Sequence, residues 1–335
     1  MAGITLAQLA QVETDPAKKW IELNILRECK VMDKLPFESV SSLQVRAAYW
    51  ETLPTGGAWR SVNEGYTSAE DGQIGDAWEA LYGFGGDITF DTVMEKVGNT
   101  IKDPVQLQME GKLKAMSMDW NYAFINGDQA VDPKQFNGLK KRVASLPSRQ
   151  TVYATSTTSA APHDPTATAA TARAMLNKFN QAWRYCSAGN VNMILCNEDW
   201  IVGFSRILAL LQGSGNYLAV TKDQFGREEV SYRGVPFIDM GLKKDMSTEV
   251  ISNAETAGDA GADSMSVYFA SVNTQDGLYG IQLNPFTAYD PLNGGEMETK
   301  PSKLRRVDWW NGLATFGRYG IVRLRNIERL ADWTE

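Results

Sequence analysis

The chain has little histidine and little cysteine. Its 335 residues include one histidine, His163, and three cysteines, Cys29, Cys186 and Cys196. An odd number of cysteines without CxxC spacing argues against a disulfide framework and against a zinc site. We expect the cysteines to be small buried apolar residues in a reducing compartment. His163 lies in a segment rich in Thr, Ala and Ser that is typical of an exposed loop, so no metal or catalytic role is expected for it.

Long apolar runs and phosphate-binding motifs are also absent. No stretch reaches the roughly 18 consecutive apolar residues of a membrane-spanning helix, and the N-terminus lacks the pattern of a secretory signal. The segment GFGGDI (83–88) lacks the third glycine of the dinucleotide fingerprint, and no GxxxxGK[ST] sequence occurs. The net charge is −7 and the pI is near 5.0, which gives no reason to expect tight binding to nucleic acid or anionic membranes. We expect a soluble, unexported protein with no cofactor, no metal and no membrane partner.

The clearest pattern that is present is a long helix within residues 101–128. Asp103 can cap its N-terminus, Pro104 suits the first turn, and Asn126 with Gly127 supplies a left-handed exit. Its apolar residues form two stripes. The regular stripe consists of Met109, Leu113, Met116, Trp120 and Phe124. The second, less regular stripe consists of Leu107, Ala115, Met118, Tyr122 and Ile125. Two interpretations follow. The helix is either buried in a core, or it packs on its own domain with one side and on other chains or extended segments with the other.

The region before this helix has β-type alternation. Segments SLQVRAAYW (42–50) and ITFDTVMEK (88–96) are expected to be antiparallel partners. The polar residues between them are too many for a hairpin turn, and they predict a protruding two-stranded loop with a polar tip near residues 61–75. Such a loop needs a surface on which to lie.

The region after the helix has a mixed α/β pattern. We expect a connector over 131–147 and a helix that carries Ala172, Phe179 and Trp183. A buried strand at 191–196 and a second helix capped by Asn197 should follow. Further strands are expected within 228–240, 264–273 and 277–283, and a closing strand near 321–325.

Charge is distributed unevenly along the chain. Residues 35–87 contain eight acids and two bases, a balance of −6, whereas residues 300–325 contain seven bases and one acid, a balance of +6. The two segments are either complementary surfaces that meet between copies or two ordinary solvated faces. Adjacent acids such as Glu70 and Asp71, or Glu228 and Glu229, are usually solvated, so acid/base catalysis is unsupported by the sequence without being excluded.

The order of these segments resembles the major capsid proteins of tailed bacteriophages. The phrases FNGL (136–139), YRGVPFIDMG (232–241) and GLATFGRYGIVRLRNIE (312–328) are similar to that family as well. The resemblance implies an α+β fold, the tailed-phage major capsid fold, with an N-terminal arm, an extended E-loop, a long spine helix in a peripheral domain and a mixed α/β axial domain. The implied divisions are an arm at 1–40, the E-loop and its flanking strands at 41–98, the peripheral domain with the spine helix at 99–149, the axial domain at 150–299, and a return strand at 300–335 that completes the peripheral domain.

The resemblance also implies a function and partners. A structural protein of this family assembles as hexamers and pentamers into an icosahedral shell around double-stranded DNA, which it contacts nonspecifically. A separate scaffolding protein and a portal would be partners, and the protein would be made in the host bacterial cytoplasm and reside in the virion capsid. No lysine occurs between Lys34 and Lys96, so the isopeptide cross-link that some members form from an E-loop lysine is not expected. We hypothesise that the acids Glu64, Glu70 and Asp71 of one copy lie near the bases Arg305, Arg306 and Arg318 of another.

Two alternatives remain at this stage. A bacterial nanocompartment shell, which encloses cargo enzymes, would have a similar fold and a different role. A soluble α+β enzyme would instead be monomeric and would have a deep pocket lined by perturbed acids.

Overall fold

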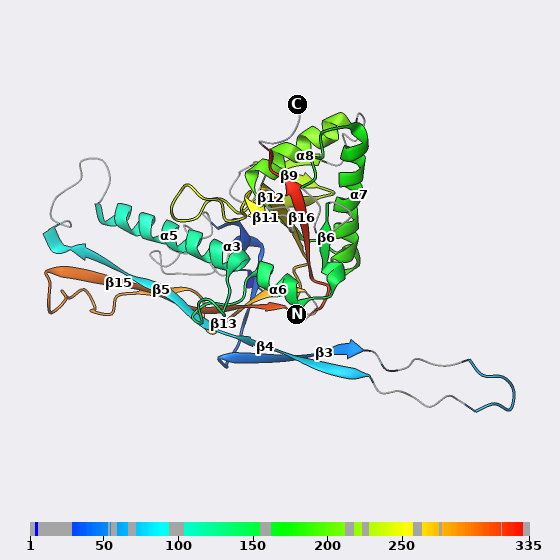
Figure 1. Ribbon diagram of the computed structural model, residues 1–335. Helices are drawn as coiled ribbons and strands as arrows, with labels where there is room; N and C mark the ends of the chain where they lie inside the picture. The colour runs from blue at the N-terminus through cyan, green and yellow to red at the C-terminus, as the bar shows by residue number, and fades with distance from the viewer. Residues whose placement is uncertain are drawn as a thin grey trace.

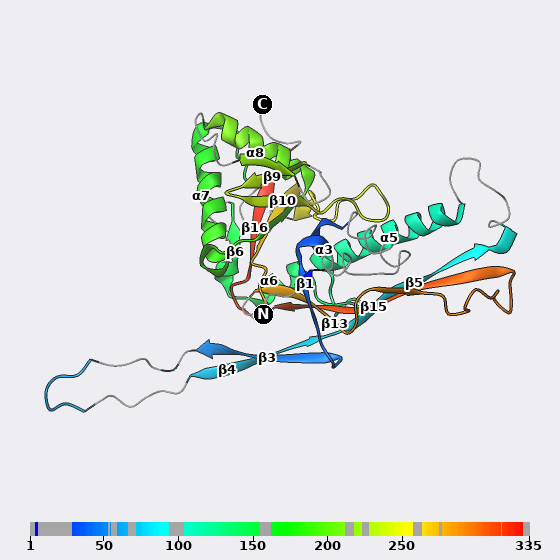
Figure 2. The ribbon, with the colours of Figure 1, turned by 180° about the vertical axis from the view of Figure 1, so that it is seen from behind.

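A computed structural model shows two domains side by side and a hairpin that projects away from both (Figure 1). One domain is upright and carries two helices on its outer side, and the other is an elongated sheet beneath a long helix. The view from behind gives the same arrangement (Figure 2). The structure describes residues 4–5, 29–52, 54, 59–65, 72–93, 104–154, 162–211, 218–222, 228–256, 263–274, 277–315 and 317–330.

A six-stranded sheet forms the floor of the elongated domain. Its order is β1-β2-β13-β15-β14, and β5 pairs with β15 outside this path. The strands are β1 (Ile4–Thr5), β2 (Pro36–Ser39), β5 (Tyr82–Asp91), β13 (Leu278–Gln282), β14 (Thr287–Tyr289) and β15 (Ser302–Thr315). The long β15 pairs with β5 over ten register positions, so these two strands set the length of the domain.

An eight-stranded sheet forms the centre of the upright domain. Its order is β6-β16-β12-β7-β10-β9-β8, and β11 pairs with β12. The strands are β6 (Thr151–Tyr153), β7 (Met193–Cys196), β8 (Leu218–Lys222), β9 (Glu228–Tyr232), β10 (Val235–Asp239), β11 (Glu255–Thr256), β12 (Asp263–Ala270) and β16 (Ile321–Glu328). A third, two-stranded sheet consists of β3 (Gln44–Thr52) and β4 (Gln73–Ala80).

The described helices lie on these sheets. They are α3 (Lys30–Lys34), α5 (Pro104–Asn126), α6 (Leu139–Ser145), α7 (Ala169–Tyr185) and α8 (Glu198–Leu210), with single 3-10 turns at Ser148–Gln150 and Ser187–Gly189. In Figure 1, α5 runs along the six-stranded sheet, whereas α7 and α8 belong to the upright domain.

Helix α5 confirms the predicted long helix. It begins at Pro104 and ends at Asn126, while Asp103, the predicted cap, lies outside the described residues. The predicted left-handed exit is wrong, because neither Asn126 nor Gly127 has a positive φ. Glycine is required at 127 for another reason, since a side chain there would approach the Ala123 carbonyl oxygen within 2.5 Å. The regular stripe faces the core, where Trp120 stacks on Phe124 with ring centroids 5.1 Å apart.

The second stripe of α5 is partly covered by the chain's own residues. Leu107 is exposed, and the ring of Tyr122 lies 5.1 Å from the Lys243 ammonium. The Asn126 side-chain amide donates to the Val250 carbonyl at 2.7 Å. The segment between β10 and β11 therefore contacts this side of α5 at Tyr122 and Asn126. Cover by other chains stays a prediction.

Two main hydrophobic cores meet at the eight-stranded sheet. Strand β7 alternates between them, since Met193 and Leu195 join the core around α5, and Ile194 and Cys196 join the core under α7 and α8. This alternation is the period of two that a strand covered on both faces requires. The two domains thus share a continuous interior through the sheet.

The helix, strand and helix around β7 were correctly predicted. Thr168 caps α7 in a capping box with Thr171, and the Asn197 side chain accepts from the Trp200 backbone N–H at 3.0 Å at the start of α8. The three cysteines are buried and unpaired, as expected. Burial raises the pKa of the Cys29 and Cys186 thiols to about 12, so neither thiol ionises near neutral pH.

Several predictions about strand partners and loops are wrong. Strand β3 pairs with β4 over eight register positions, and β5 pairs with β15, so 42–50 and 88–96 are not partners. Strands β4 and β5 follow each other directly, separated only by Leu81, and they pair with different strands, β4 with β3 and β5 with β15. The connector 131–147 contains the helix α6. The strands expected at 264–273 and 277–283 are present as β12 and β13, which belong to different sheets.

The closing residues and His163 also differ from expectation. Only β15 completes the six-stranded sheet, because β16 pairs with β12 in the eight-stranded sheet. His163 is not in a free loop, since its backbone N–H donates to the Asn326 carbonyl at 3.0 Å and it forms a bridge with Ile327. The small polar residues around His163 are typical of an exposed loop, but the bridge attaches this segment to β16 of the eight-stranded sheet.

Candidate assembly surfaces

The β3–β4 hairpin has apolar side chains with nothing over them. It extends away from both domains in Figures 1 and 2. Ile74 and Trp78 of β4 are 62% and 61% exposed and lie on the same face of the strand. Arg46 opposite Trp78 has its guanidinium 5.5 Å from the indole and forms a 2.6 Å ion pair with Asp76. An isolated two-stranded sheet is at best marginally stable in water, so this hairpin is suited to being covered by another surface.

The tip of the hairpin presents an aromatic residue to solvent. Trp59 is fully exposed and Val62 is 91% exposed. The turn is held locally, because the Glu64 carboxylate accepts from the Ser61 backbone N–H at 3.0 Å and the Arg60 guanidinium donates to the Glu64 carbonyl at 3.2 Å. Tryptophan is among the residues that most often dominate protein interfaces, which makes the tip a candidate contact point.

The root of the hairpin is fixed by a largely buried ion pair. The Arg142 guanidinium of α6 contacts both carboxylate oxygens of Glu79 in β4, and it donates to the Leu313 carbonyl at 2.6 Å and the Asn137 carbonyl at 2.7 Å. The side chains of Arg142 and Glu79 are only 10% and 16% exposed. This bidentate contact sets the angle at which the hairpin leaves the body.

The structure brings the acidic and basic segments together inside one copy. The Arg306 guanidinium donates to both carboxylate oxygens of Asp87 at 2.7 and 2.9 Å, and the hydrogen bonds from Arg306 lower the pKa of that carboxyl. Arg318 donates to the Glu51 backbone carbonyl at 3.3 Å, with its guanidinium 4.0 Å from the Glu51 carboxylate. Both acids belong to the segment with the −6 balance.

These contacts affect the predicted contact residues unequally. Glu64 is exposed at the tip and Arg305 is exposed on β15, so both are accessible to a second copy. Arg306 and Arg318 already have acidic partners, whereas Glu70 and Asp71 lie outside the described residues. Contact between copies through these six residues stays a prediction.

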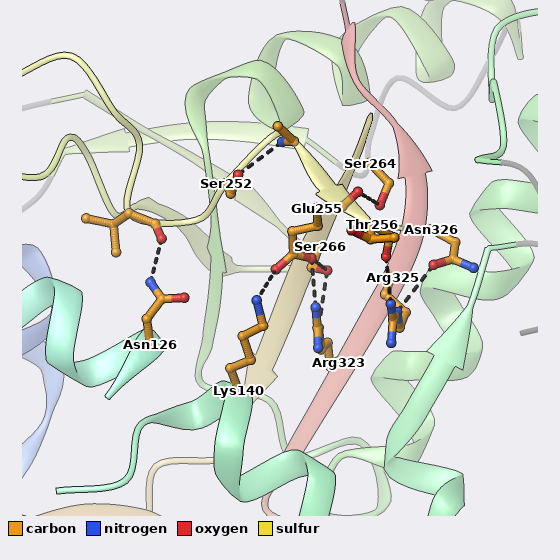
Figure 3. A network of polar contacts seen from close by, with 12 residues as sticks. Asn126, Lys140, Ser252, Glu255, Thr256, Ser264, Ser266, Arg323, Arg325 and Asn326 are labelled. Atoms are coloured by element: carbon orange, nitrogen blue, oxygen red, sulfur yellow. Dashed lines mark hydrogen bonds and ion pairs between the residues drawn. The ribbon is translucent and has the colours of Figure 1, made fainter. Parts of the chain in front are cut away.

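A polar network that the sequence did not indicate joins the two domains (Figure 3). The Glu255 carboxylate of β11 pairs with Arg323 of β16 at 2.7 Å and with Lys140 of α6 at 3.1 Å, and it accepts from the Ser266 hydroxyl. Burial alone would raise the pKa of Glu255, but Arg323 and Lys140 outweigh it, so the pKa is lowered. Sequence spacing cannot reveal such a network because its members are far apart along the chain.

The described residues do not offer a metal centre. No group of three or more His, Cys, Asp or Glu side chains among them is placed to hold a metal ion. In the same part of the chain, no helix is long and apolar enough to cross a membrane.

Comparison with known proteins identifies the class to which this fold belongs. No curated protein sequence matches the chain. The chain resembles the SrpI encapsulin of Synechococcus elongatus PCC 7942 with a TM-score of 0.58 and 13% identity over 91% of this chain and 89% of that one. It resembles the capsid of an empty GTA particle with a TM-score of 0.55 and 13% identity over 89% of each chain. The match to a structure from Mycobacterium phage Bobi has a TM-score of 0.53 and 13% identity over 96% of this chain and 98% of that one.

The chain therefore has the fold shared by phage capsid proteins and encapsulins. Residues 90–231 match the family described as SU10 major capsid protein. The predicted α+β capsid fold and the resemblance to phage major capsid proteins are thus confirmed, and together the matches support a capsid shell protein.

Proposed function

We propose that this chain is a structural major capsid protein that assembles as hexamers and pentamers into an icosahedral shell enclosing double-stranded DNA. The observation that carries the proposal is the match of residues 90–231 to a phage major capsid protein family, on a fold shared with shell proteins. The exposed hairpin supports it, because Trp59, Ile74 and Trp78 gain a dry environment only if another molecule covers them.

The proposed role is structural rather than catalytic, with the virion capsid as its location after synthesis in the host bacterial cytoplasm. A separate scaffolding protein and a portal are proposed partners. Contact with packaged DNA is nonspecific in this proposal, since a chain with a net charge of −7 offers phosphates only local basic patches.

A nanocompartment shell is the second candidate, and the encapsulin match favours it specifically. Expression of the full chain alone, and then with its neighbouring genes, separates the two. We expect regular shells in negative-stain micrographs only when scaffolding and portal genes are present, and nuclease-protected double-stranded DNA only in the phage context. Shells that form from the chain alone and enclose an enzyme would favour the second candidate. A soluble monomer under every condition would reject both.

The predicted contact between hairpin acids and closing bases can be tested in the same assay. Replacing Glu64, Glu70 and Asp71 with lysine should reduce assembly at low salt, because like charges would then face Arg305, Arg306 and Arg318. Replacing the same acids with glutamine removes the attraction without adding repulsion and should have a smaller effect. Unchanged assembly of the lysine variant at low ionic strength would reject this contact.

A further inference from the structure

The upright domain carries several cations on the solvent side of α7 and beside its C-terminal end. We define the basic flank as Arg173, Lys178 and Arg184 of α7 together with Arg149, which precedes β6. Helix α7 contains no acidic residue. In the described part of the chain none of these four side chains forms an ion pair.

Two hollows adjoin the basic flank. Arg149, Lys178 and Tyr185 line a cavity of about 310 Å³, and Arg149 and Tyr185 also line a second one of about 460 Å³ that includes Arg318 and Tyr319. The Arg149 guanidinium lies 4.3 Å from the Tyr185 ring centre. No carboxylate lines either cavity. Arg318 is paired with Glu51, but Arg149 and Lys178 beside the Tyr185 ring form no ion pair in the described part of the chain, so this side is suited to receive an acidic surface.

The same domain carries unpaired negative charge near the start of α8. We define the acidic flank as Glu198, Asp199, Asp239 and Glu249. Asn197 donates to Glu249 at 3.1 Å, Asn253 donates to Asp199 at 3.3 Å, and the Gly241 N–H donates to Asp239 at 3.0 Å. All these donors are neutral, and within the described ranges none of the four carboxylates pairs with a cation.

The lysines nearest in sequence to the acidic flank are directed elsewhere. Lys243 lies over the Tyr122 ring, and the Lys244 ammonium is 3.5 Å from Asp119, so both point to α5. Burial raises the pKa of Glu249, and the neighbouring charges of Asp199 and Asp239 raise it further. The carboxylates of this flank therefore repel one another, and within the described ranges no cation lies at ion-pair distance from them.

Helix α7 and the segment between β10 and β11, which carries Glu249, lie on opposite sides of the domain. In Figure 1, α7 is at one side and the segment between β10 and β11 is at the other, and Figure 2 shows the same separation from behind. Charges placed this way cannot neutralise each other within one copy. They can do so between copies that are related head to tail, which is the geometry of a heterologous interface that closes into a ring.

We infer that the basic flank of one copy docks on the acidic flank of the next, and that this contact closes the rings of upright domains. The inference rests on the proposed function and names the surfaces that it needs. A nucleic acid could neutralise only the basic flank, because its negatively charged phosphates would repel the carboxylates of the acidic flank. A second copy satisfies both flanks with a single interface.

Charge reversal in the full chain tests this contact. The first variant carries Arg173→Glu, Lys178→Glu and Arg184→Glu, and the second carries Glu198→Lys, Asp199→Lys and Glu249→Lys. Each should reduce ring and shell yield at low salt by about tenfold or more, because each places like charges face to face. A charge-conserving control, with Arg173→Lys, Lys178→Arg and Arg184→Lys, should assemble like the parent. Circular dichroism of the unassembled variants checks that they are folded.

Two rescue experiments separate lost complementarity from lost folding. A chain with all six reversals has its flank charges exchanged and should assemble again. An equimolar mixture of the two single-flank variants should form six-membered rings by alternation, but not five-membered rings, which cannot alternate. If the single-flank variants assemble like the parent, or if both rescues fail with folded protein, the inference is wrong.

Further outcomes separate this inference from its alternatives. Reduced DNA protection with normal assembly of the first variant would assign the basic flank to nucleic acid instead. A parent chain that never assembles under any condition would reject the proposed function itself, whereas normal assembly of all variants would reject the flank contact alone.

Discussion

At the scale of single residues, Glu255 connects β11 with β12, β16 and α6. Its carboxylate serves Arg323, Lys140 and Ser266 at once, and its side chain is 8% exposed. Arg323 is similarly buried, and its guanidinium lies 5.6 Å from the Tyr268 ring centre. Two buried charges are stable here only as a pair, because either alone would lose its hydration without compensation.

Glu255→Gln should therefore lower the free energy of unfolding by about 3–5 kcal/mol, because it leaves Arg323 charged and buried. Chemical denaturation of the unassembled chain measures this. Lys140→Met is the matched control, since Lys140 is 46% exposed on the same carboxylate and its removal should change stability by about 0–1 kcal/mol. Equal effects of the two variants would contradict the central role of the Glu255–Arg323 pair.

The lowered pKa of the Glu255 carboxyl makes the stability of the fold depend on pH. Its folded pKa is lowered from the ordinary 4.5, so its contribution to stability is fully present above that value and is lost as the pH falls through the lower folded pKa. The stability difference between the parent and Glu255→Gln should shrink on acidification from about pH 7 to pH 3. Unfolding curves at several pH values measure this, and a difference that is constant over the range would count against it.

At the scale of elements, the orientation of the hairpin depends on the contact between β4 and α6. Arg142→Ala removes the guanidinium that binds Glu79, Leu313 and Asn137. We expect faster amide hydrogen exchange in β3 and β4, with α7 unchanged, because the hairpin loses its anchor and the upright domain does not. Arg46→Ala provides the control, since it breaks a solvent-exposed pair further along the same hairpin. Similar exchange in both variants would mean that Arg142 does not anchor the root.

The sequence predicted elements better than their partners. Helix α5 was predictable because Pro104, Asn126 and Gly127 mark its ends and Trp120 and Phe124 keep its period. The pairing of β5 with β15 was not predictable, because alternation reveals that a segment is a strand but says nothing about a mate more than 200 residues away.

Predicted site residues show the same limit. Charge counting found the two oppositely charged segments, and the structure joins Asp87 to Arg306 within one copy. Charge counting did not identify Arg142 and Glu79, because their roles depend on burial at the hairpin root. The flanks of the upright domain were missed as well, because Arg184 and Glu249 belong to regions whose local charge balance is unremarkable in the sequence.

At the scale of the whole molecule, the tip of the hairpin separates stability from assembly. The Trp59 side chain is fully exposed, so it is not expected to contribute to the stability of a single copy. Trp59→Ala should change the unfolding free energy of a single copy by no more than about 0.5 kcal/mol. It should raise the protein concentration needed for assembly by about tenfold or more if the indole is buried against a neighbour.

Light scattering during assembly and thermal unfolding of the unassembled chain measure these two effects. Val131→Ala is the control, because Val131 is 81% exposed at a distant turn and its loss should affect neither. Assembly of Trp59→Ala at the parent's concentration would show that the tip is not an anchor.

The continuity of β4 and β5 has a mechanical consequence. Only Leu81 separates the two strands, and its backbone N–H donates to the Leu43 carbonyl at 2.9 Å, so the ribbon has no slack at this point. A pull along β4 would load the ten register pairs between β5 and β15 in shear, where many bonds must yield together. Tension on β4 would therefore pass directly to β5 and along the six-stranded sheet.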